Sequence, residues 1–309
     1  GALAEHPLRQ PWARLNGPHA DVAWARSVIE ASGGALTAEP EQIRTWNLSS
    51  LWRLPTTLGV AWLKVVPPFF AHEGAVLAAL PPAPVPRLLG HDGARVLLAE
   101  VAGEDLHTAP LHERLPMVDV LVAIQQQWIG RCDELIRLGA ADWRAPALTQ
   151  AIGALLERRA AELAADERAR LLAFNAQLPE RFAAIEGCGL RETLVHGDFH
   201  AGNFRGDGHN LTLLDWGDSG VGHPLLDQPA FVERNEAGDA ETIRAHWAAA
   251  WRQGTPGVQV ERAAGLLAPI AAARQALIYQ NFLDGIEDNE HPYHREDPVL
   301  WLRRAAEQL

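Results

Sequence analysis

Cysteine and long apolar runs are scarce in this sequence, and each shortage excludes a class of protein. Its 309 residues include two cysteines, Cys132 and Cys188, which cannot form the disulfide framework of a small secreted domain. No stretch approaches the roughly 18 uninterrupted apolar residues of a transmembrane helix, and the sequence does not start with a basic segment followed by an apolar one. We therefore expect a cytoplasmic protein that does not bind a membrane.

Positive charge is also in short supply. The sequence has 27 lysines and arginines against 39 aspartates and glutamates, which gives a net charge of −12, and Lys64 is its single lysine. This balance argues against nucleic acid or an anionic membrane as a partner, because both favour a basic surface. An acidic protein suits cationic small molecules better. With 48% apolar and 21% charged residues, the chain has ample material for one two-lobed domain or two domains.

Strand patterns dominate the first hundred residues, and helical patterns dominate the rest. The expected strands are 43–48, 51–54, 60–66, 85–89 and 95–100, with a turn at Ser49 and Ser50 and helices over 21–31 and 70–80. After a short junction at 101–103, helices are expected over 111–139, 146–176, 179–187 and from 225 onward. This order predicts an α+β protein with a strand-rich part, 1–100, and a helical part, 101–309.

The segment 194–216, Leu-Val-His-Gly-Asp-Phe-His-Ala-Gly-Asn-Phe…Leu-Leu-Asp-Trp, carries most of the functional signal. A turn-rich run centred near His209 predicts a β-hairpin that places Asn203 opposite Asp215. Two oxygen ligands that face each other across a hairpin form a seat for a hard cation such as Mg²⁺. Asp198 lies one short loop earlier, where its carboxylate is free to orient a hydroxyl. Together the three side chains outline a phosphoryl-transfer site.

These residues resemble the aminoglycoside phosphotransferase and choline kinase family, whose members are related to protein kinases. The match is the order H-G-D-x-H-x-x-N over residues 196–203, followed by a hydrophobic strand that ends in Asp215. The resemblance implies a bilobal protein-kinase-like fold, with a small antiparallel β-sheet lobe and a larger, mainly helical lobe. It also implies that Asp198 is the catalytic base, and that Asn203 and Asp215 hold Mg²⁺ against the phosphates of ATP.

The same resemblance gives supporting roles to other residues of the motif. His196 and His200 are expected to hold the loop by hydrogen bonds, and Asp227, at the end of Gly-His-Pro-Leu-Leu-Asp, is expected to brace it. Two alternatives come from the residues alone. Asp198 can simply cap the turn that follows it, as aspartate often does. The H-x-x-x-H spacing of His196 and His200 can hold zinc, although the glutamate of H-E-x-x-H is missing and glycine interrupts the loop.

The first hundred residues contain the lysine and glutamate that a kinase-like fold requires. Such a fold uses a strand lysine to bind the α- and β-phosphates and a helix glutamate to orient that lysine. Lys64 lies in the apolar strand 60–66, where an unpaired ammonium is costly. The helix that begins nearby offers Glu73 as its partner. The alternative is an edge-strand lysine whose stem covers apolar surface while its ammonium reaches solvent.

The turn between the first two strands lacks the G-x-G-x-x-G sequence of protein kinases. An asparagine, a leucine and two serines stand there instead, and small-molecule kinases of the resembled family often use serine at this place. We therefore expect Ser49 and Ser50 to offer hydroxyls or amides to phosphate, although Asn-Ser-Ser is also an ordinary turn composition. The segment from Glu100 to Ala102 is expected to be the hinge, where backbone groups read the adenine edge.

The acceptor substrate is expected to bind the helical part and the C-terminal segment. Residues 279–293 combine four acids with two tyrosines and several amides, which suits an amino sugar, an aminoglycoside or a choline-like alcohol. The candidate contacts are Tyr279, Asp284, Glu287 and Asp288, with Trp216 lining the cleft. The alternative is a solvated acidic helix end, because charge runs usually mark solvent.

These observations predict an ATP- and Mg²⁺-dependent phosphotransferase that acts on a hydroxyl of a small polar, amine-bearing molecule. One alternative is a catalytically silent, nucleotide-binding or regulatory relative, although such a protein need not keep Lys64, Glu73, Asp198, Asn203 and Asp215 together. Protein-kinase activity is a third reading. The missing glycine-rich loop and the missing A-P-E anchor of an activation segment count against it.

Overall fold

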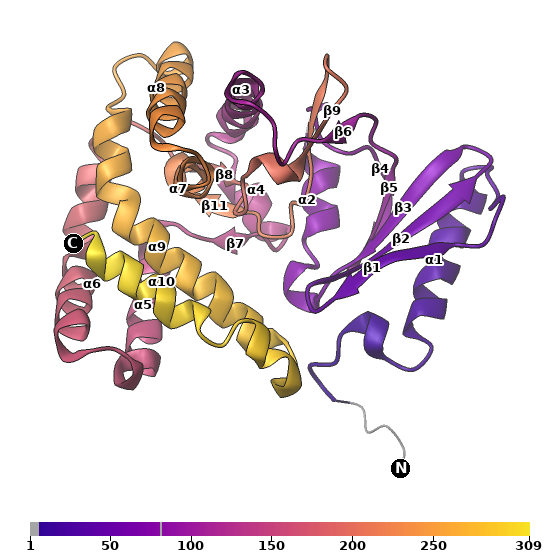
Figure 1. Cartoon of the computed structure of the whole chain (residues 1–309), viewed down its shortest axis with the longest axis horizontal. Helices are drawn as coiled ribbons and strands as arrows, with labels where there is room; N and C mark the ends of the chain where they lie inside the picture. The colour runs from indigo at the N-terminus through magenta and orange to yellow at the C-terminus, as the bar shows by residue number, and fades with distance from the viewer. Residues whose placement is uncertain (1–5, 81) are drawn as a thin grey trace.

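The first part of the chain forms a five-stranded antiparallel sheet. The computed structural model describes residues 6–80 and 82–309. The strands lie in the order β1-β2-β3-β5-β4. They span Glu41–Trp46 (β1), Ser49–Thr56 (β2), Gly59–Val65 (β3), Leu88–Asp92 (β4) and Arg95–Ala99 (β5). Figure 1 shows this sheet on one side of the molecule and the helical remainder of the chain on the other.

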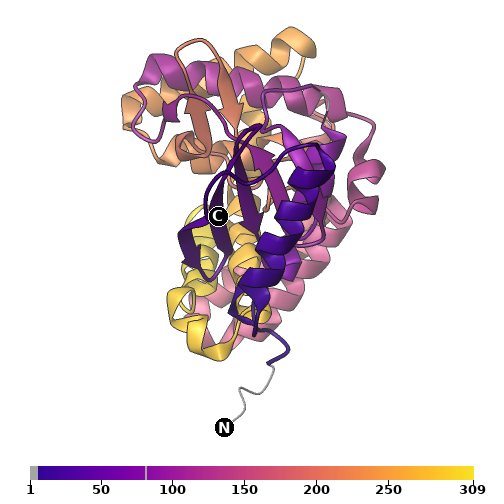
Figure 2. The ribbon, with the colours of Figure 1, turned by 90° about the vertical axis from the view of Figure 1, so that its right-hand side faces the viewer.

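Two helices flank the sheet. α1 (Gly17–Ala31) buries Ala25 and Ile29 against Leu63 and its neighbours on the sheet, and Figure 2 shows this helix crossing the outer face. α2 (Glu73–Ala79) lies between the sheet and the helical part of the chain (Figure 1). Because side chains alternate along a strand, Lys64 points to the face opposite Leu63. That face is the one toward α2.

The remainder of the chain is mainly helical, and α9 is buried along most of its length against α5, α6, α8 and α10. The helices are α3 (Leu111–Trp128), α4 (Cys132–Arg137), α5 (Ala145–Arg159), α6 (Ala165–Glu186), α7 (Gln228–Glu233), α8 (Ala237–Gly254), α9 (Val260–Gly285) and α10 (Asp297–Glu307). Shorter 3₁₀ helices are η1 (Pro11–Ala13), η2 (Pro68–Phe70), η3 (Ala160–Glu162), η4 (Ala201–Asn203), η5 (Pro224–Asp227) and η6 (Asp288–Tyr293).

The predicted α+β class is confirmed, whereas the lobe boundary at residues 100 and 101 stays a prediction. No helix in the described ranges combines the length and the apolar character needed to cross a membrane.

Two small sheets lie between the large sheet and the helices and carry the loops of interest. In one, β11 (Gly220–Gly222) lies between β7 (Ala141–Asp142) and β8 (Thr193–Val195). In the other, β9 (Phe204–Gly206) lies between β10 (Leu211–Leu213) and β6 (Glu104–Asp105). The loop 196–203 therefore leaves one small sheet and enters the other.

The predicted hairpin is present as β9 and β10, but its register differs by one residue from the prediction. Leu213 pairs with Phe204, and the amide of Leu214 donates to the carbonyl oxygen of Asn203 at 2.7 Å. Asn203 therefore lies opposite Leu214, and the predicted pairing with Asp215 is wrong. The cause is a tight turn in which the side chain of Asp207 accepts the following backbone amides, so that the turn is centred before His209.

The turn between β1 and β2 is also shorter than predicted. Ser49 is already paired with Trp46 as the first residue of β2, so the turn consists of Asn47 and Leu48, and its placement at Ser49 and Ser50 is wrong. Both serine hydroxyls are held by neighbouring side chains. Trp46 Nε1 donates to Ser49 Oγ at 2.8 Å, and Ser50 Oγ lies 3.0 Å from Thr45 Oγ1.

Candidate active site

Three charged side chains, from β3, from α2 and from the segment after β10, meet where the large sheet faces the β9–β10 hairpin. Lys64 Nζ, on β3, lies 2.8 Å from Glu73 Oε1, at the first residue of α2. The same nitrogen lies 2.7 Å from Oδ1 of Asp215, two residues after β10. Glu73 is buried, whereas the side chain of Asp215 is 51% exposed. The expected ion pair of lysine and glutamate is therefore present, and it has a third, more accessible member.

The charges of this cluster support one another. Burial lowers the pKa of the Lys64 ammonium, but the carboxylates of Asp215 and Glu73 outweigh burial and raise it. Burial likewise opposes ionisation of Asp215, yet the charge of Lys64 prevails and lowers the pKa of that carboxyl. Lys64 and Asp215 are therefore both charged at neutral pH. Asp215 reaches the lysine through a left-handed backbone conformation, with φ of 60°, which turns it away from the strand.

Asp198 lies in the loop between β8 and η4, directly after a glycine that the loop requires. Gly197 has φ of +93°, and a Cβ at this position would lie 2.1 Å from the carbonyl oxygen of Asp218, so a larger residue would clash. Asp198 Oδ2 lies 3.3 Å from His200 Nε2 and 3.3 Å from Asn203 Nδ2. The loop therefore brings the carboxylate of Asp198 beside one of the two predicted metal ligands.

The surroundings of Asp198 keep its carboxyl ionised. Burial raises its pKa, but the hydrogen bond and charge of His200, with a further contribution from Arg234, lower it to about 2. A carboxylate with so low a pKa is a weak base. It is therefore suited to orient a hydroxyl and to receive its proton late, while the phosphoryl group is being transferred. Because the side chain is 40% exposed, an acceptor can reach it.

Asp227, at the end of η5, ties the loop 196–203, hereafter the catalytic loop, to the helical core. Its buried carboxylate accepts hydrogen bonds from the amides of His196 at 2.9 Å and Gly197 at 2.8 Å, and from Gln125 Nε2 at 3.0 Å. His196 in turn places Nε2 at 2.9 Å from the carbonyl oxygen of Leu214. Burial lowers the pKa of His196, so its ring is neutral and donates this bond. These contacts hold the start of the loop, beside the residue that precedes Asp215.

His223, at the N-terminus of η5, is expected to make the protein less stable in acid. Its Nδ1 accepts the amide of Leu225 at 3.2 Å, and burial lowers the pKa of the ring to about 3. An unfolded chain binds a proton at histidine near pH 6.5, so stability is complete above that pH and falls as pH drops, because only the unfolded state takes up the proton. Between pH 7 and pH 5 we expect a loss of about 2 kcal/mol in the free energy of unfolding.

Denaturant unfolding of the wild type and of His223→Asn at both pH values measures this contribution. Asparagine keeps an acceptor for the amide of Leu225 and does not titrate, so its unfolding free energy should depend less on pH. A variant with the pH dependence of the wild type would refute the assignment.

Asn203 and Asp215 have the chemistry of a site for a hard cation. The amide nitrogen of Asn203 donates to the carbonyl oxygen of Asp198 at 2.8 Å, which leaves Asn203 Oδ1, like Asp215 Oδ2, without a hydrogen bond to any described residue. Amide and carboxylate oxygens fit Mg²⁺, and these two residues would hold it. No cluster of three or more His, Cys, Asp or Glu side chains in the described ranges could hold a metal alone. Magnesium here would therefore take its other ligands from phosphate and water, as it commonly does.

The structure does not bring most of the predicted substrate residues to Asp198. Trp216 is fully buried against His196, with ring centroids 4.7 Å apart, so the expectation that it lines the cleft is wrong. Tyr279 packs against Phe282 and His294 and is only partly exposed. Burial, followed by the nearby charges of Asp297 and Asp198, raises the pKa of its hydroxyl, so this residue lies on the catalytic side of α9.

The acids at the end of α9 have other partners. Asp284 pairs with Arg158 at 2.7 Å, and Glu287 pairs with Arg9 at 3.0 Å. The helix ends at Gly285, so Asp284 and Glu287 do not share a helix face. The side chain of Asp288 is 95% exposed. Asp284 is also ten residues beyond Arg274, which contacts the catalytic loop, and this spacing corresponds to about 15 Å along the helix. Their prediction as substrate contacts is not supported by this geometry.

Two residues that the sequence reasoning missed lie beside the catalytic loop. Burial, and then the charges of Asp198 and Asp215, raise the pKa of Asp218 well above its usual range. No hydrogen bond or close ion pair joins its carboxyl to another residue in the described part of the chain. Arg274, buried in α9, donates to the carbonyl oxygen of Gly197 at 3.2 Å. The available signals were a second acid three positions after Asp215, and an isolated arginine in an apolar helix.

The hinge segment is attached to the metal-site hairpin by an arginine. Arg205, on β9, donates through Nε to the carbonyl oxygen of Val101 at 3.2 Å and through Nη2 to that of Gly103. The predicted hinge residue Glu100 uses its own amide to continue the large sheet, donating to the carbonyl oxygen of Val60 at 3.1 Å. Ala102 lies between the two carbonyl groups that Arg205 holds. The backbone that was predicted to read adenine is therefore fixed relative to Asn203, which directly precedes β9.

Replacing Arg205 by leucine is expected to raise KM for ATP about fivefold and to leave kcat within twofold, since about one net hydrogen bond of hinge positioning is lost. Steady-state kinetics at varied ATP and saturating acceptor measure the two constants. Arg168→Leu, at an exposed position of α6, controls for removal of a surface arginine. An unchanged KM for ATP would contradict this role of Arg205.

Comparison with solved structures identifies the fold. The structure is similar to the macrolide 2'-phosphotransferase of Brachybacterium faecium, with a TM-score of 0.61 and 18% identity, over 90% of this chain and 97% of that one. It is also similar to choline kinase from Cryptosporidium parvum, with a TM-score of 0.61 and 13% identity, over 94% and 96% of the two chains. A third relative, aminoglycoside 2'-phosphotransferase-IIIa in complex with GDP, gives 0.57 and 12%, over 93% and 98%. At these identities the similarities establish the fold.

The family assignment comes from the sequence. A comparison with curated proteins gives no significant match. The model of the phosphotransferase enzyme family matches residues 53–267, which include Lys64, Glu73 and the whole catalytic loop. The predicted protein-kinase-like fold and the resemblance to aminoglycoside phosphotransferases and choline kinases are thereby confirmed. The chain belongs to the phosphotransferase enzyme family.

Proposed function

We propose that this protein transfers the γ-phosphoryl group of ATP, with Mg²⁺, to a hydroxyl of a small amine-bearing molecule. The observation that carries the proposal is the accessible, ionised carboxylate of Asp198 beside Asn203, within one hairpin of the Lys64–Glu73–Asp215 cluster. These are the parts that phosphoryl transfer requires, because the reaction depends mainly on positioning and charge stabilisation. The same complete set weighs against a catalytically silent relative.

Each residue has a defined task in this reaction. The acceptor oxygen forms a bond to the γ-phosphorus while the bond from that phosphorus to the bridging oxygen of ADP breaks. Asp198 orients the acceptor hydroxyl and receives its proton as the new bond forms. Lys64, held by Glu73, offers its charge to the phosphates of the nucleotide. Mg²⁺, when bound by Asn203 and Asp215, neutralises the charge that develops on the phosphates.

Asp218 supports an amine-bearing acceptor. Its carboxyl lies beside the catalytic loop without a close cationic partner among the described residues, and burial, followed by the charges of Asp198 and Asp215, raises its pKa. An ammonium group placed there would restore ionisation and form a charge-assisted contact. This contact would hold a neighbouring hydroxyl of the same molecule near Asp198. The acidic overall charge of the protein favours the same class of substrate.

Consumption of the nucleotide donor, measured with matched pairs of acceptors, tests the substrate class. The pairs are glucosamine with glucose, and ethanolamine with ethylene glycol, each with ATP and separately with GTP as the donor. We expect turnover with the amine of at least one pair, at a kcat/KM about tenfold above that of its neutral partner. Equal turnover of both members of every pair would refute the amine preference and leave the phosphotransferase assignment standing.

Asp218→Asn is expected to lower kcat/KM for the preferred amine about tenfold, because a charge-assisted contact is lost. Its kcat/KM for the neutral partner should stay within twofold. Steady-state kinetics with both acceptors measure this difference, and Asp288→Asn, at an exposed acid, is the control. An equal loss for both acceptors would show that Asp218 supports the loop and does not bind the amine.

A further inference from the structure

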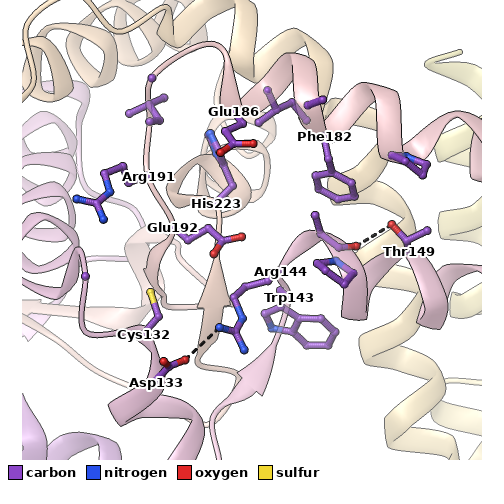
Figure 3. Close-up of a pocket in the computed structure, with 18 of the residues that line it drawn as sticks. Cys132, Asp133, Trp143, Arg144, Thr149, Phe182, Glu186, Arg191, Glu192 and His223 are labelled. Carbon is purple, nitrogen blue, oxygen red and sulfur yellow. Dashed lines mark hydrogen bonds and ion pairs between the residues drawn. The ribbon is translucent and has the colours of Figure 1, made fainter.

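A pocket of about 900 Å³ lies away from Asp198, between α4, α5, α6 and the start of β8. Figure 3 shows the side chains around it. Glu192 lines this pocket and precedes β8, whereas the catalytic loop follows β8. At about 3.3 Å per residue, the strand separates Glu192 from His196 by roughly 13 Å. The pocket is therefore distinct from the site of phosphoryl transfer.

Carboxylates crowd one wall of this pocket. Glu186 and Glu192 line it, and burial, with added repulsion from Asp142 and Glu186, raises the pKa of Glu192. Arg144 also lines the pocket, but its guanidinium is already paired with Asp142 at 2.7 Å and with Asp133 at 3.2 Å. Arg191 is the second arginine of the lining, so three lining carboxylates, Asp133, Glu186 and Glu192, stand against two arginines, and the lining keeps one net negative charge. A cation in the pocket would relieve this repulsion.

The inner wall supplies the buried ring N–H group of His223 and an aromatic surface. His223 and Trp143 line the pocket, and each is 8% exposed. His223 Nδ1 accepts the amide of Leu225, so the hydrogen is on Nε2. His223 Nε2 lacks a hydrogen-bond partner in the described part of the chain, whereas Trp143 Nε1 lies against Gly220 and not in the pocket. Buried donors normally have an acceptor. With Phe182 on the same pocket, the lining suits an aromatic molecule that carries an oxygen acceptor.

Both inner-wall residues are one contact away from the supports of the catalytic loop. His223 holds the start of η5, and η5 ends at Asp227, whose carboxylate accepts the amides of His196 and Gly197. On the other side, the guanidinium of Arg274 lies 5.7 Å from the ring centroid of Trp143 and donates to the carbonyl oxygen of Gly197. A molecule that contacts His223 or Trp143 therefore acts on the groups that fix this loop.

We propose that this pocket is an effector site for a small aromatic amine that carries an oxygen acceptor, and that its occupation changes the stability of the catalytic loop. The ammonium lies at the Glu186–Glu192 wall, and the ring and its oxygen face Phe182, Trp143 and His223. The amine class follows from the excess of carboxylate, and the aromatic body follows from the lining rings.

Calorimetric titration of the full chain without nucleotide tests the binding. The probes are tyramine and 3-(4-hydroxyphenyl)propionate, which share a phenol and a two-carbon chain and differ in the sign of their charge. We expect tyramine to bind at least tenfold more tightly than the propionate, and Glu192→Gln to weaken it about fivefold. Ala183→Trp fills the pocket from an exposed position of α6 and should abolish binding, whereas Ala176→Trp, exposed on the same helix but outside the pocket, should not.

Hydrogen exchange of the segment 193–203, with and without tyramine, tests the coupling. We expect occupation to change the exchange rate of this segment at least threefold in the wild type and in Ala176→Trp, with no change in Ala183→Trp. Equal binding of the two probes, binding that survives Ala183→Trp, or binding without a change in exchange would each overturn the proposal. Neither measurement requires turnover, so a negative result leaves the proposed phosphotransferase function untouched.

Discussion

Asp198→Asn is expected to lower kcat by about three orders of magnitude, the middle of the range for loss of a group that handles the transferred proton. Asparagine has the same shape, and its oxygen can still contact His200. It cannot receive a proton from the acceptor hydroxyl. Because Asp198 does not belong to the Lys64 cluster, the KM for ATP should stay within twofold. Initial rates over a grid of ATP and acceptor concentrations measure both effects.

Thermal unfolding of Asp198→Asn should match that of the wild type within about 1 kcal/mol, since the replaced side chain is 40% exposed. The matched control is Asp288→Asn, whose side chain is 95% exposed and which should leave kcat and both KM values unchanged. A kcat for Asp198→Asn within tenfold of the wild type would mean that another group receives the proton.

Lys64→Met is expected to lower kcat/KM for ATP by two to three orders of magnitude, roughly the effect of removing one pre-organised charge at a reacting centre. It should also destabilise the fold by about 3 kcal/mol, because Glu73 would be left buried without its partner. Steady-state kinetics and denaturant unfolding measure the two losses separately.

The double variant Lys64→Met/Glu73→Gln separates the catalytic from the structural role of this pair. Removing the second charge relieves the unpaired carboxylate, so most of the lost stability should return. Activity should stay as low as in Lys64→Met. If the double variant recovered activity together with stability, the lysine would be structural and the phosphate-binding role would be refuted.

The β9–β10 hairpin was predicted from the sequence, but its register was not. Residues 194–216 predict the catalytic loop, the strands and the hairpin, because glycine, the turn-forming run and the buried strand each leave a local signal. The register was off by one residue because the side chain of Asp207 closes the turn early. Asp215 therefore lies outside the ladder, and its left-handed backbone carries it to Lys64. No local pattern announces that conformation in a residue other than glycine.

The substrate contacts, in contrast, were poorly predicted from the sequence. The acids at the end of α9 were predicted to contact the substrate because several of them lie close together in the sequence. In the structure, Asp284 and Glu287 are paired with Arg158 and Arg9 from distant parts of the chain. A count of local charge cannot detect such partners. Asp218 stands three residues after Asp215, but its burial beside Asp198 depends on tertiary neighbours that only the fold reveals.

Direct detection of the phosphorylated acceptor tests the central claim most sharply. Purified protein is incubated with ATP, Mg²⁺ and each amine-bearing alcohol, and the product is identified by mass spectrometry and phosphorus NMR. The account predicts a phosphate ester on a hydroxyl of at least one acceptor, formed by the wild type and by Asp288→Asn, and nearly abolished in Asp198→Asn. Formation of the same ester at an undiminished rate by Asp198→Asn, or no ester with any acceptor although the protein binds ATP, would contradict it.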